Sequence, residues 1–124
     1  MLNEGYKVLI KKAKEIYKGI KCIECPALNN EKIFFNRKGF QHLLYKKGDR
    51  RNKSDQINRL ILIQDVVDIV RESQKYNELR DNGDIKFWSL VSIKNGMCIT
   101  VVICQKGTGV KYFLSVMAKK HKTS

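Results

Sequence analysis

The last third of the chain limits the fold most strongly. Three segments rich in β-branched and aromatic residues follow one another between Asp84 and Ala118. Asn95-Gly96 is the dipeptide preferred in two-residue hairpin turns, and the two glycines in residues 106–109 indicate a second turn. We therefore expect a three-stranded antiparallel meander. The expected strands are residues 84–94, 97–105 and 110–118.

The first turn sets the register of this meander, because a two-residue loop pairs Lys94 with Met97 and Trp88 with Ile103. One face is then continuously apolar and should receive the helices. Its residues are Trp88, Leu90, Met97, Ile99, Val101 and Ile103.

The opposite face mixes hydroxyl, aromatic and thiol side chains, a composition that suits phosphate contacts and base stacking. Its residues are Phe87, Ser89, Val91, Cys98, Thr100 and Cys104. A second turn of four residues would pair Thr100 with Ser115 and would add Lys111, Phe113 and Ser115 to this face. A slip of one residue would exchange the two faces.

The first two thirds of the chain predict helices. Residues 2–20 repeat apolar side chains with helical spacing and carry lysines on the opposite side. Residues 39–47 predict a short helix with Phe40 and Leu43 on its buried side. Residues 54–72 predict two helical segments with a bend near Ile63-Gln64. Ser54 and Asp65 are the expected caps of these two segments.

The remaining segments have weaker patterns. Residues 20–35 are extended in character, with a turn at Pro26 and Asn29-Asn30 and a brief strand at 33–35. Residues 48–53 and 73–84 are expected to be loops. The complete pattern predicts an α+β fold, with N-terminal helices packed on one face of a three- to four-stranded antiparallel sheet. We expect one domain over residues 1–120 and a basic tail over 121–124, because 124 residues suit a single hydrophobic core.

The charge is strongly positive and clustered. The chain carries 25 Lys and Arg against 12 Asp and Glu, a net charge of +13. Residues 37–53 hold seven basic side chains and one acid, and residues 86–124 hold seven lysines and no acid. Such clusters are typical of proteins that bind phosphate backbones. A solvated surface, an anionic membrane or an acidic protein partner would also tolerate this charge.

The sequence gives no indication of export, membrane insertion or a cofactor. Lysines interrupt the first apolar stretch, and no apolar run reaches the length of a membrane span. We therefore expect a cytoplasmic protein with reduced cysteines and no membrane partner. Cys22 and Cys25 form a CxxC pair, but Cys98 and Cys104 are poorly spaced for zinc, so we expect no metal site and no cofactor.

His42 is the candidate proton carrier, because it is the only histidine outside the expected tail and basic residues follow it closely. RNA cleavage without metal needs a base for the ribose 2′-hydroxyl, cations for the phosphorane and an acid for the leaving oxygen. A histidine among lysines and arginines can supply these groups. A purely structural role for a helical histidine is equally compatible with this pattern.

Residues 30–119 resemble a known family. The segment FFNRKGFQHLLYKKGDRRNKSDQINRLILIQDVVDIV, followed by FWSL, CITVVIC and KYFLSVM, is similar to the phage-associated branch of the barnase, EndoU, colicin and RelE-like ribonuclease superfamily. The resemblance implies helices first, then an antiparallel sheet whose open face holds RNA. It implies His42, Arg51 and Ser115 as the catalytic positions. No carboxylate stands where a barnase-type base would be.

These observations predict a metal-independent endoribonuclease, acting as a toxin or phage effector that cleaves RNA by 2′-hydroxyl attack on phosphate. The expected RNA-binding residues are Lys46, Lys47, Arg50, Thr100 and Lys111. The resemblance also implies an acidic antitoxin or immunity protein as a partner. Two alternatives stay open: a non-catalytic nucleic-acid-binding module, and an inhibitor that blocks a nucleic-acid-handling host system.

Overall fold

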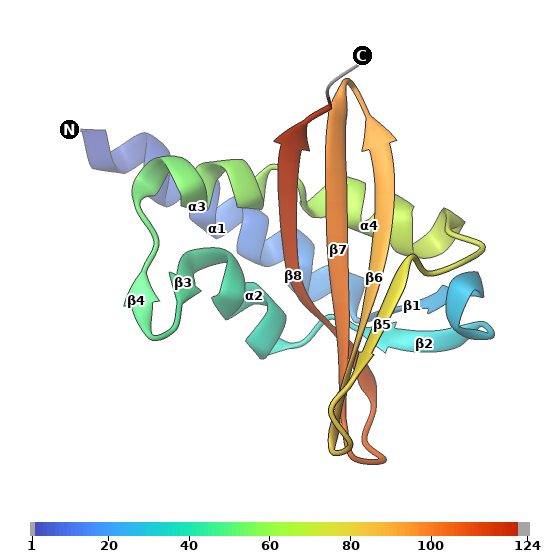
Figure 1. Cartoon of the computed structure of the whole chain (residues 1–124). Helices are drawn as coiled ribbons and strands as arrows, with labels where there is room; N and C mark the ends of the chain where they lie inside the picture. The colour runs from blue at the N-terminus through green and yellow to red at the C-terminus, as the bar shows by residue number, and fades with distance from the viewer. Residues whose placement is uncertain (1, 122–124) are drawn as a thin grey trace.

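The computed structural model describes residues 2–121, which form an α+β fold (Figure 1). The helical part comprises α1 (Leu2–Ile20), the short 3₁₀ helix η1 (Pro26–Leu28), α2 (Arg37–Leu44), α3 (Lys53–Leu60) and α4 (Ile63–Glu72). The strands are β1 (Cys22–Cys25), β2 (Glu31–Phe34), β3 (Tyr45–Lys46), β4 (Asp49–Arg50), β5 (Glu78–Asp81), β6 (Ile85–Lys94), β7 (Met97–Lys106) and β8 (Lys111–Lys120). Residues 122–124 of the expected tail lie outside the described residues.

The main sheet is larger than predicted and mixed rather than antiparallel. Its strand order is β1-β2-β8-β7-β6-β5, and β3 and β4 form a separate two-stranded ribbon. β3 replaces the end of the helix predicted over residues 39–47, and β4 lies where a loop was expected. β2 pairs with β8 in parallel, through Ile33 opposite Lys111. No local sequence pattern predicts this pairing, because the two strands are far apart in sequence. β5 was predicted as part of a loop because its residues are mostly polar. All four are exposed, and the strand joins the sheet only through its pairing with β6.

The hairpin of β6 and β7 has the predicted register, with Lys94 opposite Met97 and Trp88 opposite Ile103. The second predicted register is wrong. Thr100 lies opposite Met117, and Ser115 lies opposite Val102. Two irregularities cause this: the connection begins with Gln105 opposite Lys111, one residue later than predicted, and β8 then bulges.

The bulge explains which side chains reach each face. Pairing moves from Val102–Ser115 to Ile103–Phe113, so Leu114 has no partner in β7. The one-residue shift moves Lys111 and Phe113 to the helix-covered face, contrary to the prediction. The bulge then returns Ser115 to the open face, where it was expected.

The helices and the sheet enclose one core. α1 and α4 lie behind the long strands, whose front face is open in Figure 1. The predicted apolar face is buried except at half-buried Met97, and Leu90, Val101 and Ile103 are fully enclosed. No helix among residues 2–121 is both long and apolar enough to cross a membrane.

The helix ends differ from the predicted caps. Asn52, not Ser54, caps α3, and its side-chain oxygen accepts a hydrogen bond from the Asp55 amide at 2.8 Å. α4 begins after Leu62 without a side-chain cap, and the break between the helices falls at Ile61-Leu62, slightly before the expected bend. Asn52 precedes Ser54 by two residues, and asparagine is as good an N-cap residue as serine. The sequence pattern alone therefore did not distinguish the two.

α2 packs unusually close to β8. A Cβ atom on Gly39 would overlap the Phe113 main-chain oxygen, the Phe113 ring and the Tyr17 hydroxyl, so only glycine permits this approach. Tyr17 in α1 donates a hydrogen bond of 2.6 Å to the Asn36 carbonyl just before α2. α2 is therefore held against both the sheet and α1, and its side chains project from fixed positions.

Candidate functional site

A cavity of about 670 Å³ opens between α2 and the lower part of the open sheet face. One side of α2 lines it with Lys38, Gln41, His42 and, at the helix end, Tyr45, a set with the spacing of a single helical face. Its complete lining is Lys38, Gln41, His42, Tyr45, Lys47, Gly48, Ile85, Phe87, Cys104, Lys106, Tyr112 and Leu114. We call this the His42 cavity.

The sheet wall of the His42 cavity is a regular set of paired positions. Phe87, Cys104 and Tyr112 lie opposite one another across β6, β7 and β8. Ile85 and Lys106 form the next pair toward the strand ends. Aromatic rings and one lysine thus face α2 across the cavity, because alternate residues of a strand point to the same side.

The electrostatics of the His42 cavity favour anions. Three lysines and a histidine line it, and none of its lining residues is acidic. Among the ion pairs of residues 2–121, none involves Lys38, Lys47 or Lys106. Contact with the Lys106 amine and repulsion between the two ammonium charges hold the pKa of Lys38 below its usual value. Two unneutralised cations that face each other are a favourable site for a phosphate.

His42 is half-buried in the wall of this cavity. Its burial, and then the positive charges of Arg51 and Arg59, lower its pKa below the ordinary value of 6.5. The imidazole is therefore neutral near pH 7 and can accept a proton. Burial and contact with the Cys104 thiol raise the pKa of the Tyr112 hydroxyl, which stays protonated and can donate a hydrogen bond.

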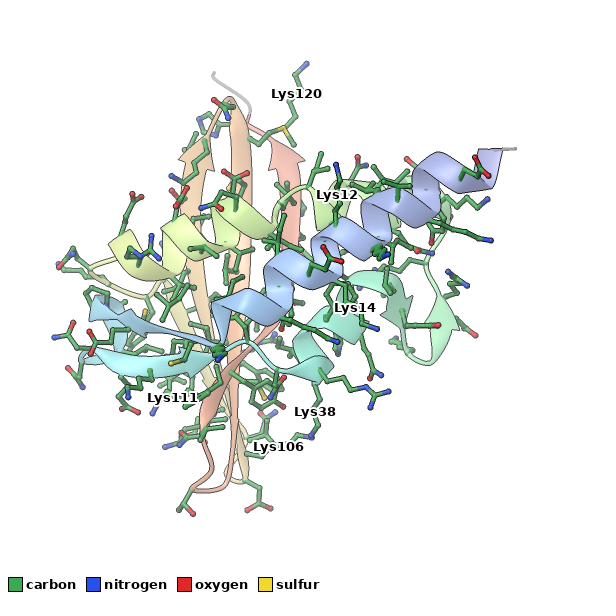
Figure 2. All side chains as sticks on the ribbon, turned by 180° about the vertical axis from the view of Figure 1, so that it is seen from behind. Lys12, Lys14, Lys38, Lys106, Lys111 and Lys120 are labelled. Atoms are coloured by element: carbon green, nitrogen blue, oxygen red, sulfur yellow. The ribbon has the colours of Figure 1, made fainter. Side chains whose placement is uncertain are left out.

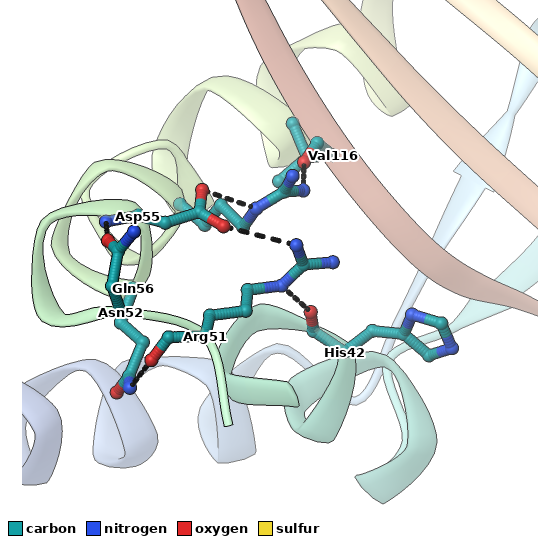
Figure 3. A network of polar contacts seen from close by, with 7 residues as sticks. His42, Arg51, Asn52, Asp55, Gln56 and Val116 are labelled. Carbon is teal, nitrogen blue, oxygen red and sulfur yellow. Dashed lines mark hydrogen bonds and ion pairs between the residues drawn. The ribbon is translucent and has the colours of Figure 1, made fainter. Parts of the chain in front are cut away.

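Arg51 holds the main chain of His42 rather than lining the His42 cavity. Its Nε donates to the His42 carbonyl at 2.9 Å, and its Nη1 contacts the Asp55 carboxylate at 3.1 Å. Figure 3 shows the His42 ring directed away from this contact. The side chain of Arg51 is only 7% exposed.

Asp55 joins two arginines in what we call the arginine cluster, consisting of Arg51, Asp55 and Arg59. Arg59 contacts the other carboxylate oxygen at 2.9 Å and donates to the Val116 carbonyl in β8. Burial alone would raise the pKa of Asp55, but hydrogen bonds and charges from Arg59 and Arg51 outweigh it and lower the pKa. The cluster ties the end of α2 and α3 to the sheet (Figure 3).

The predicted RNA-binding residues are divided among several places. Lys47 lines the His42 cavity. Lys46 and Arg50 lie on the neighbouring β3–β4 ribbon, in a separate groove that also includes Arg51. Arg50 donates to the Tyr6 hydroxyl at 3.2 Å.

The predicted residues of the sheet do not meet at His42. Ser115 and Thr100 are half-buried on the open face and do not line the His42 cavity. Lys111 lies on the other face, where its ammonium pairs with Glu31 at 2.6 Å and lies over the Trp88 ring. The structure thus brings His42 together with Lys47 and not with Ser115, Thr100 or Lys111.

Sequence reasoning missed most of the residues that surround His42. Lys38 precedes His42 by one helical turn, and Tyr45 follows it by three residues, so helical spacing could have indicated both. The register of β6 and β7 placed Phe87 and Cys104 on the open face. No local sequence pattern predicts that Lys106 and Tyr112 lie beside α2. The close packing of α2 against β8 at Gly39 determines which strand ends α2 contacts.

No protein-family model matches the chain, and comparisons with curated proteins and with solved structures found no match. Among the described residues, no group of three or more His, Cys, Asp or Glu side chains is arranged to hold a metal ion. The geometry and charge of the His42 cavity are therefore the features that point to a function.

Proposed function

We propose that this protein is an endoribonuclease that cleaves RNA at the His42 cavity by attack of a ribose 2′-hydroxyl on the adjacent phosphate. The observation that carries the proposal is the meeting of a neutral, half-buried histidine with three lysines that form no ion pair among the described residues, in a cavity without acidic side chains. The resemblance of residues 30–119 to the ribonuclease superfamily points to the same chemistry. A toxin or phage-effector role, with an acidic inhibitor as partner, belongs to this proposal.

The proposed reaction needs two proton transfers and charge stabilisation. Neutral His42 takes the proton of the 2′-hydroxyl, and the 2′-oxygen forms a bond to phosphorus. The bond from phosphorus to the 5′-oxygen breaks, and Lys38 gives that oxygen a proton. The products are a 2′,3′-cyclic phosphate and a 5′-hydroxyl. His42 then releases its extra proton to solvent, and Lys38 takes up a proton from solvent.

The lysines stabilise the charge that develops on the phosphorane. Lys38 and Lys106 face each other, so a phosphate between them contacts both ammonium groups. The lowered pKa of Lys38 makes its ammonium a better acid than an ordinary lysine. Phe87 and Tyr45 line the cavity, and stacking of an unpaired base on such rings would favour single-stranded RNA.

The test is digestion of a labelled single-stranded RNA by wild type and by His42→Ala, both with EDTA present. We expect wild type to produce 2′,3′-cyclic phosphate ends and His42→Ala to cut about 10² to 10⁴ times more slowly. Affinity for a 2′-deoxy analogue should change little, because the imidazole acts on the hydroxyl that the analogue lacks.

Each variant must first show the circular dichroism spectrum and melting behaviour of wild type. Cleavage by His42→Ala at the wild-type rate would contradict the assigned base. Binding of the analogue without cleavage of any RNA by wild type would contradict the enzyme and support a non-catalytic binding module.

A further inference from the structure

A second basic cavity lies on the other side of α2. It has a volume of about 380 Å³ and opens between α1 and the start of α2. Its lining is Lys14, Tyr17, Lys18, Lys21, Phe35, Asn36, Arg37 and Phe40. We call it the α1–α2 cavity. None of these residues belongs to the His42 cavity, and the proposed reaction uses none of them.

Helical spacing builds this cavity from two sides. Lys14, Tyr17 and Lys18 have the spacing of one helical face at the end of α1, and Lys21 follows directly after the helix ends at Ile20. Arg37 and Phe40 share a face of α2 in the same way. α2 therefore directs one face to each cavity, and the neighbouring residues Arg37 and Lys38 lie on opposite sides of the division.

The walls of the α1–α2 cavity are held in place before any ligand binds. Tyr17, Phe35 and Phe40 are 3%, 6% and 8% exposed, and their rings pack against one another. The Lys21 carbonyl accepts a hydrogen bond of 2.8 Å from the Phe35 amide, which fixes the end of α1 against the start of α2. A ligand would therefore meet basic groups on a rigid floor, which lowers the entropic cost of binding.

The charges of this cavity are not used within the described chain. Four of its side chains are cationic and none is acidic. Across residues 2–121, none of the ion pairs includes Lys14, Lys18, Lys21 or Arg37. Four gathered cations repel one another, so an anionic ligand would stabilise this arrangement.

The two cavities are neighbours along one side of the molecule. Figure 2 shows Lys14 on α1, Lys38 on α2 and Lys106 at the end of β7 following one another, whereas Lys12 points away from this line. A nucleic-acid strand that leaves the His42 cavity past Lys38 would meet Arg37 next. From there Lys18 and Lys14, one helical turn apart, continue along α1.

We propose that the α1–α2 cavity is a second RNA-binding site, which holds the phosphate backbone of nucleotides that flank the cleaved bond. This proposal rests on the proposed ribonuclease function. RNA fits better than a membrane surface, because α1 packs Ala13 and Tyr17 into the protein core, and its exposed apolar side chains Val8 and Ile16 do not line this cavity. An interfacial helix would need that apolar face for lipid.

The test measures binding of 2′-O-methyl RNA, which cannot be cleaved, so its outcome does not depend on catalysis. Two probes are compared: a dinucleotide, which fits the His42 cavity alone, and an oligonucleotide of about eight nucleotides, which can reach both cavities. The variant is Lys14→Gln/Lys18→Gln. Its matched control is Lys12→Gln/Lys32→Gln, which removes the same charge from exposed lysines outside both cavities.

We expect Lys14→Gln/Lys18→Gln to weaken octanucleotide binding roughly tenfold and to lower the log–log salt slope by about 1.4, since each phosphate contact on a single strand contributes about 0.7. Dinucleotide binding should stay unchanged. NMR should show shifts of the Arg37 and Phe40 amides with the octanucleotide and not with the dinucleotide.

Three outcomes would overturn the proposal. The control variant could weaken octanucleotide binding as much as the test variant, which would indicate general charge attraction. The test variant could bind the octanucleotide as tightly as wild type. Vesicles of anionic phospholipid could bind wild type more tightly than Lys14→Gln/Lys18→Gln while RNA binds both equally, which would assign the cavity to lipid. Whether wild type or His42→Ala cleaves RNA tests only the proposed function, because binding of 2′-O-methyl RNA is measured without cleavage.

Discussion

Two groups of cations lie close to His42, and the protein uses them differently. In the arginine cluster, Arg51 and Arg59 are 7% and 15% exposed and share the carboxylate of Asp55. In the His42 cavity, Lys38 and Lys106 face each other, and none of the residues that line that cavity is acidic. A cation paired with a carboxylate inside the fold contributes to structure, whereas a cation without an acidic partner can hold an anionic ligand.

This difference corrects a simple expectation about basic sequences. Arg50 and Arg51 are adjacent and chemically identical, yet Arg51 is enclosed in the arginine cluster and Arg50 is exposed on the β3–β4 ribbon. Charge counts along the chain do not separate these two uses. The position of one carboxylate, that of Asp55, separates them, because it pairs with Arg51 and not with Arg50.

Removal of that carboxylate should give the largest effect. We expect Asp55→Ala to lower the free energy of unfolding by about 2 kcal/mol, because two mostly buried guanidinium groups lose their shared partner. The loss is kept moderate because Asp55 itself is 37% exposed. Urea denaturation at pH 7 measures it. The control is Asp84→Ala, which removes an exposed aspartate just before β6 and should change stability by less than about 0.5 kcal/mol. Equal losses in both variants would remove the distinction between the two groups of cations.

The opposite pattern is expected in the His42 cavity. Lys106→Gln should leave stability unchanged or slightly higher, because it relieves repulsion with Lys38. Its affinity for single-stranded RNA should fall about threefold to tenfold, with a salt slope lower by about 0.7. Lys111→Gln is the matched control, since it removes the same charge from a lysine already paired with Glu31. Fluorescence titrations at several salt concentrations compare the two. A larger loss of affinity in Lys111→Gln would show that RNA binds on the other side of the sheet.

The smallest effect should appear in the pH dependence of stability. Because the folded-state pKa of His42 is lowered, its protonation opposes folding, and stability should fall as pH decreases below about 6.5. The carboxylate of Asp55 also has a lowered pKa, so its contribution is lost only below its ordinary value of 3.8. Thermal melts of wild type and His42→Asn between pH 7 and 3 separate the two. The variant should lack the first loss and keep the second. A first loss of equal size in both proteins would contradict the lowered pKa.

The elements recognised in advance are those that nearby residues specify. Asn95-Gly96 set the register of β6 and β7, and helical periodicity indicated α1 because apolar side chains recur along a single face. The same local patterns identified His42 as a histidine within a helix. Each of these signals is complete within about ten to twenty residues, so no distant contact is needed to interpret it.

The missed features depend on contacts between distant parts of the chain. β2 joins β8 in parallel, β5 is held only as an edge strand, and the bulge at Leu114 sets which face each residue of β8 occupies. The neighbours of His42 were missed for the same reason. Gly39 lets α2 approach β8, and this approach brings His42 to the lysine of a strand end more than sixty residues away. Local propensity carries no information about such a meeting, because packing free energy is gained only once the whole core has formed.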